Sequence, residues 1–334
     1  METTSTASPT TLTSSILQVR NVTVKYFSRQ GHVTALENVS LEIPKVGYTL
    51  GVVGESGSGK TTLGMSIMNV IEPPGRIVSG SVEYMGRNVM KMSESELRNY
   101  RWKEIAMVYQ SAMNSLNPVK SVYNPISEVI REHERGVSRG EAHERAVKLL
   151  SEVGIKPERV NNFPHQLSGG MRQRVVIALA LALSPKILIA DEPTSALDVV
   201  VQRQILSLLK KQVLSKGLSL VFITHEISLL NGLVDNVIVM FAGEIVESGP
   251  VRDILLKPSH PYTEVLLSTV LAGEKQLSAM LNFGQDAFSE DASVLAANAC
   301  KYARRCRYAF DRCLKEKPLL RETENGRLVA CHKY

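Results

Sequence analysis

The chain has 334 residues, of which 44% are hydrophobic and 22% are charged, and its formal net charge is +6. These values suit a water-soluble protein with one large domain and a smaller one. No uncharged apolar run reaches about 18 residues, so the sequence offers no membrane-spanning helix. Residues 1–15 are rich in Thr and Ser and lack the features of a signal peptide. They predict a disordered leader on a cytoplasmic protein.

The stretch GESGSGKTT, residues 54–62, follows a short apolar strand and precedes a helix that starts with Thr61. Its spacing is that of a P-loop, G-x-x-x-x-G-K-[ST], and a plain glycine-rich turn is the alternative. Glycines let backbone N–H groups approach phosphate oxygens, Lys60 reaches the β- and γ-phosphates, and the Thr61 hydroxyl suits Mg²⁺. The predicted phosphate contacts are Gly54, Ser56, Gly57, Gly59, Lys60, Thr61 and Thr62.

A signal for an anion also comes from the stretch LSGGM, in which Ser168, Gly169 and Gly170 precede an apolar helix. The serine predicts a helix N-cap, and the free N–H groups and positive dipole end behind it suit an anion. A capped helix without a ligand is the alternative.

Two acids, Asp191 and Glu192, end the apolar run at residues 187–190. Such a run is typical of a buried parallel strand. Two acids at a strand end are often only a solvated edge. Beside a P-loop they favour catalysis: Asp191 is placed to hold Mg²⁺ through water, and Glu192 to polarise the water that attacks the γ-phosphate.

In chain order, GESGSGKTT, MVYQSAMNSLNP, LSGGM, ILIADEPTSALD and VFITHE resemble the motifs of ABC transporter ATP-binding subunits, over residues 16–257. The resemblance implies an α/β fold of the P-loop NTPase type. It comprises a parallel core sheet, an antiparallel β subdomain and an inserted helical subdomain at about residues 111–180. It also implies a head-to-tail dimer, in which ATP lies between the P-loop of one subunit and the signature Ser168, Gly169 and Gly170 of the other.

The resemblance implies further roles by position. Gln110 corresponds to a residue that contacts Mg²⁺ and couples the site to membrane subunits. Glu192 corresponds to the general base, Asp198 to a dimer contact, and His225 to a switch histidine beside the γ-phosphate. Tyr26 lies where the family stacks an aromatic ring on adenine, although a β-edge role and the adjacent Phe27 are alternatives. On its own, a histidine such as His225 after an apolar strand is more often structural.

Finer resemblances, in GRIVSGSVEY, DVVVQRQIL and SHPYTEVLLS, are to the D-type ATPase subunit of oligopeptide and dipeptide importers. They imply ATP hydrolysis that powers import of peptides, or of oligosaccharides, at the cytoplasmic face of the cell membrane. The implied partners are a second, non-identical ATPase, two permeases and an extracytoplasmic solute-binding protein. The alternative is an ABC-type ATPase acting on nucleic acid or ribosomes, which the single P-loop and the lack of heptads disfavour. No nucleic-acid partner is expected.

All four cysteines lie near the C-terminus, at Cys300, Cys306, Cys313 and Cys331, among many Lys and Arg residues. Disulfides are disfavoured in a reducing compartment, and the spacing leaves zinc, an iron–sulfur cluster or free thiols open. The resemblance adds a C-terminal peptide-importer-type domain, residues 258–334, that is associated with a four-iron, four-sulfur cluster. These four cysteines are therefore expected to ligate a 4Fe-4S cluster, with zinc as the alternative.

Overall fold

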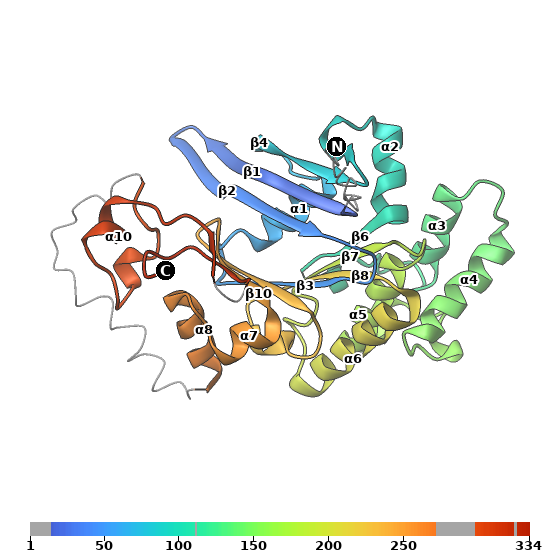
Figure 1. Cartoon of the computed structure of the whole chain (residues 1–334). Helices are drawn as coiled ribbons and strands as arrows, with labels where there is room; N and C mark the ends of the chain where they lie inside the picture. The colour runs from blue at the N-terminus through green and yellow to red at the C-terminus, as the bar shows by residue number, and fades with distance from the viewer. Residues whose placement is uncertain (1–14, 111, 272–297, 324–325) are drawn as a thin grey trace, which may run out of the picture.

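The computed structural model describes residues 15–110, 112–271, 298–323 and 326–334 (Figure 1). The predicted leader lies outside the described residues except for Ser15. That residue is buried, and its hydroxyl donates a hydrogen bond of 2.9 Å to the Glu42 carboxylate. The folded region therefore includes Ser15.

The first sheet has four strands in the order β2-β1-β4-β5, and all neighbours run antiparallel. Its strands are β1 (Leu17–Ser28), β2 (Gly31–Ile43), β4 (Gly75–Tyr84) and β5 (Arg87–Asn88). In Figure 1 its long strands lie above the core sheet. This confirms the predicted antiparallel subdomain.

The core sheet has the order β11-β12-β10-β9-β3-β8-β7-β6, and the run from β9 to β6 is parallel. Its strands are β3 (Thr49–Val53), β6 (Ile105–Val108), β7 (Ile187–Asp191), β8 (Ser219–Thr224), β9 (Asn236–Phe241), β10 (Glu244–Pro250), β11 (Arg321–Glu322) and β12 (Leu328–Val329). The parallel strands β3, β8, β7 and the edge strand β6 are buried along their whole length. This explains their continuous apolar sequences and puts their carboxyl ends at one edge, where ligands bind in such sheets.

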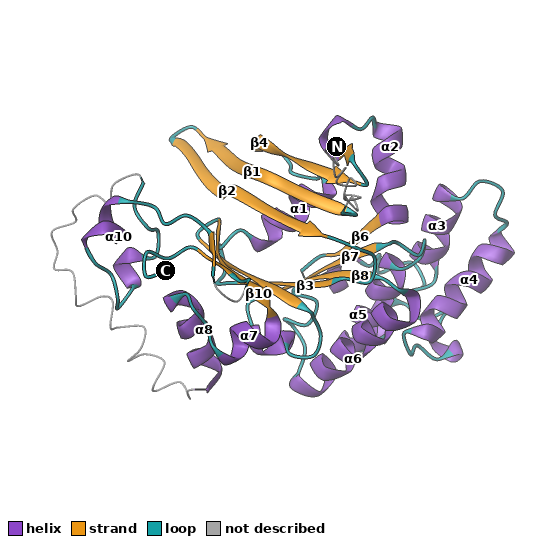
Figure 2. Ribbon diagram, in the orientation of Figure 1, coloured by secondary structure: helices purple, strands orange, loops and turns teal. Residues whose placement is uncertain are grey.

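Helices cover the core sheet and form a lobe beside it (Figure 2). They are α1 (Lys60–Met68), α2 (Glu94–Asn99), α3 (Asn124–His133), α4 (Arg139–Glu152), α5 (Gly169–Ala180), α6 (Val199–Lys216), α7 (Val251–Leu256), α8 (Pro261–Leu271) and α10 (Asp311–Lys315). Helices α3 and α4 pair in the lobe, and their buried residues include Ile126, Ile130 and Leu150. This is the predicted helical subdomain. None of the described helices has the length and apolarity needed to cross a membrane.

The C-terminal segment extends the core sheet. Strand β12 pairs antiparallel with β10, through Glu247 opposite Val329 and Ser248 opposite Leu328. Tyr302 is buried in the main hydrophobic core. A short basic segment with few large apolar side chains gains burial by packing on an existing sheet edge. It is thereby held beside the nucleotide-binding fold.

Candidate nucleotide-binding site

The predicted P-loop joins β3 to α1. Gly57 and Gly59 have φ angles of 78° and 99°, in the left-handed region that favours glycine. A Cβ atom at Gly59 would also lie 2.5 Å from the carbonyl oxygen of Ala35, so a side chain is excluded there. The buried Lys60 turns back on the loop, and its Nζ donates hydrogen bonds of 2.8 Å to the carbonyls of Gly54 and Glu55.

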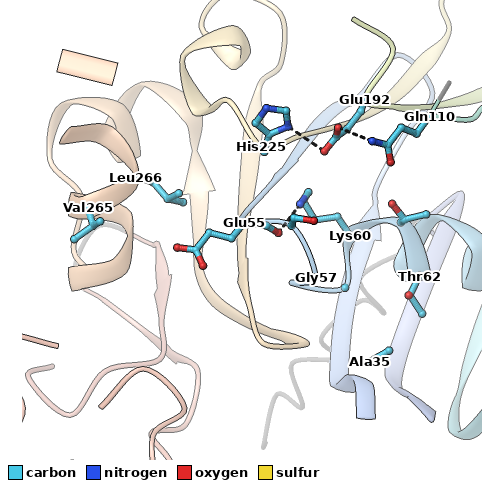
Figure 3. A pocket seen from close by; sticks show the side chains of 13 residues that line it. Ala35, Glu55, Gly57, Lys60, Thr62, Gln110, Glu192, His225, Val265 and Leu266 are labelled. Atoms are coloured by element: carbon cyan, nitrogen blue, oxygen red, sulfur yellow. Dashed lines mark hydrogen bonds and ion pairs between the residues drawn. The ribbon is translucent and has the colours of Figure 1, made fainter. Parts of the chain in front are cut away.

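This loop forms one wall of an open cavity of about 690 Å³ (Figure 3). The predicted residues that line it are Ser56, Gly57, Gly59, Lys60, Thr61, Thr62, Gln110, Glu192 and His225. They come from distant parts of the sequence and meet at the carboxyl ends of parallel strands. The cavity thus combines phosphate-binding groups with a carboxylate, an amide and an imidazole.

Glu192 is the hub of the polar wall opposite the P-loop. Its Oε1 lies 3.1 Å from Nδ1 of His225, and Nε2 of Gln110 donates a 3.2 Å hydrogen bond to its Oε2. Figure 3 shows the three side chains pointing toward one another above Lys60. Glu192 also has a left-handed φ of 45°, a conformation that costs about 1 kcal/mol or more for a residue with a side chain.

Asp191 is fully buried next to this hub. Burial raises the pKa of its carboxyl group, Glu192 adds to the rise, and the Thr61 hydroxyl and Lys60 oppose it. Burial likewise lowers the pKa of Lys60, although the carboxylates around it oppose the shift. Within the described part of the chain, neither carboxylate oxygen of Asp191 has a hydrogen-bond partner of normal geometry. An orphaned carboxylate beside a threonine hydroxyl fits the oxygen ligands that Mg²⁺ prefers.

Other predicted residues lie away from the cavity. Ser168 caps α5, because its hydroxyl accepts a hydrogen bond from the Met171 N–H. Asp198 caps α6 through the N–H groups of Val200 and Val201. A Cβ at Gly170 would lie 2.4 Å from Cγ1 of Val201, so the signature turn packs tightly on α6. The neighbouring Gly169 belongs to the same turn. Within one chain this region does not line the cavity.

Tyr26 also lies outside the cavity lining. It is on β1, opposite Val33 of β2 and Gly75 of β4, and it is partly buried against the core between the sheets. Its predicted contact with adenine stays a prediction.

Sequence reasoning missed four lining residues, Ala35, Glu55, Val265 and Leu266. Val265 and Leu266 lie on α8, within the stretch SHPYTEVLLS that carried only a family resemblance. Glu55 lies inside the P-loop stretch, and the signal for it was an acidic side chain in a loop that is expected to bind phosphate. Val265 and Leu266 make the start of the C-terminal region a wall of the site.

The predicted iron–sulfur site is not supported by the structure. Among the described residues, no three or more His, Cys, Asp or Glu side chains are arranged to hold a metal ion. Burial raises the pKa of Cys300 to about 11, and the thiols of Cys313, Cys306 and Cys331 add to the rise. At neutral pH such a thiol is protonated, whereas the form that binds a metal ion is the thiolate. The four cysteines are free in this structure.

Known proteins that are similar to this chain in sequence include ATP-binding proteins of transporters. The ABC transporter family model matches residues 36–195, and the model for the oligopeptide/dipeptide transporter C-terminal region matches residues 246–313. The chain is 46% identical to the oligopeptide transport ATP-binding protein OppD of Bacillus subtilis, over 79% of this chain and 75% of OppD. It is 40% identical to the dipeptide transport ATP-binding protein DppD of Escherichia coli, over 95% and 96% of the two chains.

Among solved structures, the dimeric ATP-binding cassette MJ0796, bound to ADP and phosphate in a post-hydrolysis state, superposes with a TM-score of 0.63. It is 32% identical in sequence, and the match covers 71% of this chain and 99% of the cassette. The shared fold, the cavity geometry and the relatives that match along nearly the whole chain lead to one conclusion. The chain belongs to the ATP-binding subunits of ABC transporters, in the oligopeptide and dipeptide importer family.

Proposed function

We propose that this chain binds ATP in the P-loop cavity and hydrolyses it to power uptake of peptides through membrane-embedded partners. The observation that carries the proposal is the placement of Glu192. Its carboxylate is held by Gln110 and His225 over the phosphate-binding lysine. This is where a general base for attack on a γ-phosphate is needed.

Each side chain has a step in this scheme. Lys60 leaves the carbonyls of Gly54 and Glu55 and turns its ammonium to the β- and γ-phosphates, while the loop N–H groups accommodate the remaining oxygens. Glu192 takes a proton from the attacking water. His225 and Gln110 keep the carboxylate in its orientation, and His225 is half exposed, within reach of a γ-phosphate.

Thr61, Gln110 and Asp191 would hold Mg²⁺. The orphaned oxygens of Asp191 are the support for this assignment. When bound, the ion neutralises phosphate charge that develops during transfer. Tyr26 remains the proposed adenine contact, because its partner Val33 on β2 is two residues before Ala35, which lines the cavity.

The site requires a second ATPase subunit. Ser168, Gly169, Gly170 and Asp198 lie outside the cavity of their own chain, so they are available to complete the cavity of a neighbour in a head-to-tail pair. The neutral Ser168 cap engages only the Met171 N–H and so leaves other N–H groups at the positive end of α5 for an anion, whereas Asp198 is the proposed dimer contact. We propose that the neighbour is non-identical, as the D-type resemblance implies.

The chain would work on the cytoplasmic face of the membrane, attached to two permeases that receive solute from an extracytoplasmic binding protein. A second cavity, of about 1060 Å³, suits a permease segment. It lies between α2 and the end of α3, and Arg98, Trp102 and His133 contribute to its lining. Trp102 precedes β6, the strand after which Gln110 follows, so movement there would reach the ATP site.

The alternative role on nucleic acid loses its main support, the basic tail. Lys301, Arg305, Arg307, Arg312 and Lys317 all form ion pairs with glutamates of this chain. Side chains that are already paired offer little to a phosphate backbone, because each contact would first break an ion pair.

We also propose that the four cysteines accept a 4Fe-4S cluster, with zinc as the alternative. The support is that the thiols of Cys306, Cys313 and Cys331 all raise the pKa of Cys300, as neighbouring ionisable groups do. Among the described residues, however, no three or more His, Cys, Asp or Glu side chains are arranged to hold a metal ion. A single zinc ion would draw sulfur atoms to about 3.8 Å from one another, as tetrahedral bonds of about 2.3 Å require. A polynuclear cluster spaces its thiolate ligands more widely than a single ion does. Loading would release the thiol protons.

One experiment tests these proposals together. The native complex is purified without oxygen, its subunits are identified by mass spectrometry, and peptide-stimulated ATP turnover is measured. Iron, acid-labile sulfide and zinc are assayed on the same sample. We expect permeases, a second ATPase and iron with sulfide. Salt-sensitive retention on nucleic acid without permeases would contradict the transport role, and zinc without iron would contradict the cluster.

A further inference from the structure

The cysteine-bearing segment, residues 298–323 and 326–334, contacts the P-loop directly. Arg305 donates two hydrogen bonds to the Glu55 carboxylate, from Nη1 to Oε2 at 2.9 Å and from Nη2 to Oε1 at 2.6 Å. Glu55 is the second residue of the P-loop stretch and lines the ATP cavity. A bidentate pair of this kind fixes both partners in one geometry.

Aromatic rings hold the arginine in place. Its guanidinium carbon lies 5.5 Å from the ring centroid of Phe241 on β9 and 5.7 Å from that of Tyr302. A third ring, that of Tyr262 on α8, packs against both with centroids 4.8 and 5.5 Å away. The Tyr262 hydroxyl accepts a 2.8 Å hydrogen bond from the Glu55 N–H. The C-terminal region therefore holds both the backbone and the side chain of Glu55.

Ion pairs hold the rest of this segment against the sheets. Lys301 lies 2.6 Å from Glu37 and 2.8 Å from Glu244, and Lys317 lies 3.0 and 2.7 Å from the same two carboxylates. Glu37 is on β2 and Glu244 on β10. Arg305 consequently approaches the P-loop from a fixed base and needs little ordering to do so.

The charge of Glu55 explains why such a contact matters. Figure 3 shows its carboxylate pointing toward the side of the cavity where Val265 and Leu266 lie, while its carbonyl oxygen accepts a hydrogen bond from Lys60. An uncompensated carboxylate at the rim of this cavity would repel the triphosphate of ATP. The guanidinium neutralises it where the anion is to bind.

We propose that Arg305 is a positioning residue for ATP: it neutralises Glu55 and fixes the first turn of the P-loop, which makes nucleotide affinity depend on the cysteine-bearing segment. The side chains of Arg305 and Glu55 are 41% and 39% exposed, so solvent screens part of the effect. A moderate change in affinity is expected, one that shrinks as salt is added.

The test uses the full chain with its partner subunits and measures ATP binding and turnover. Arg305→Ala should weaken ATP binding about 3- to 10-fold at low salt and raise KM by a similar factor, with kcat at saturating ATP within about twofold of wild type. Arg312→Ala is the matched control, because Arg312 pairs with Glu316 inside the same segment. It should bind ATP as wild type does.

A second variant separates charge from folding. If Arg305 acts by neutralising Glu55, Arg305→Ala combined with Glu55→Gln should recover most of the lost affinity. Unchanged ATP affinity in Arg305→Ala, or no recovery in the double variant, would overturn the proposal. The proposal rests on ATP binding at this cavity. The wild-type titration tests that separately, so a failure of binding itself is distinguishable from a failure of the Arg305 contact.

Discussion

Glu192 and His225 are joined by a 3.1 Å contact between a carboxylate oxygen and a ring nitrogen. The carboxylate is mostly buried, whereas the imidazole is half exposed to the cavity. This contact orients Glu192, which directly follows β7, toward the cavity that the P-loop lines. The two neighbouring acids thus have different surroundings, with Asp191 deep in the fold and Glu192 at the cavity wall.

The first prediction concerns the base. Glu192→Gln keeps the shape of the side chain and a hydrogen-bond acceptor but removes the proton acceptor, so steady-state ATP turnover should fall about 10²- to 10⁴-fold. ATP-dependent pairing with the second subunit, measured by gel filtration, should remain. Glu226→Gln is the control, because Glu226 is exposed and lies 3.9 Å from the far nitrogen of His225. Turnover within twofold of wild type in Glu192→Gln would contradict the assignment.

The second prediction links stability to the buried acid. Because the pKa of Asp191 is raised in the folded state, its protonated form adds to the free energy of unfolding. This stabilisation is complete below the pKa of the unfolded state and is lost as pH rises through the pKa of the folded state. The ionised carboxylate therefore destabilises the nucleotide-free chain at neutral pH. Asp191→Asn should raise Tm by a few degrees, on the order of 1 kcal/mol, yet lose Mg²⁺-dependent turnover. A variant that melts below wild type at pH 7 without nucleotide would contradict this.

The third prediction tests the head-to-tail pair. Gly170→Ala places a methyl group against the stiff side chain of Val201, which displaces the signature turn. The separate chain should still bind ATP, whereas turnover of the paired complex should fall at least about tenfold. Gly140→Ala is the control, since the nearest atom to its added Cβ is 4.0 Å away. Equal loss of ATP binding by the separate Gly170→Ala chain would argue against a site on the partner's cavity.

The sequence predicted what depends on local spacing. The P-loop follows from glycine positions and the lysine that ends them, and β7 follows from an apolar run that ends in Asp191. Glu192, Gln110 and His225 were placed together through the order of their motifs, and their contacts agree with it.

Contacts between distant segments left no such pattern. Arg305 and Glu55 are 250 residues apart, and no periodicity links a basic tail to one acid in a glycine loop. The pairing of β12 with the core sheet could not be predicted either, because a strand of two residues has almost no sequence pattern of its own. The cysteine spacing leaves zinc, an iron–sulfur cluster and free thiols open, because spacing along the chain does not fix the distances between the sulfur atoms.

The last prediction concerns pH and the attachment of the C-terminal region. His260 is buried, its Nδ1 accepts a 3.1 Å hydrogen bond from the Tyr262 N–H, and burial lowers its pKa to about 4, against the opposing effect of the Ala330 backbone. A folded pKa below the unfolded value of about 6.5 means that stability is complete above pH 6.5 and is lost as pH falls toward 4.

Between pH 7 and pH 5 the free energy of unfolding should therefore drop by about 2 kcal/mol through this residue alone. His260→Asn retains an acceptor for the Tyr262 N–H and has no proton to gain, so its urea midpoint should change less over the same interval. His165→Asn, at an exposed position, is the control and should keep the wild-type pH dependence. If His260→Asn loses as much stability as wild type on acidification, the burial of neutral His260 is not the cause, and the acid sensitivity belongs to another group.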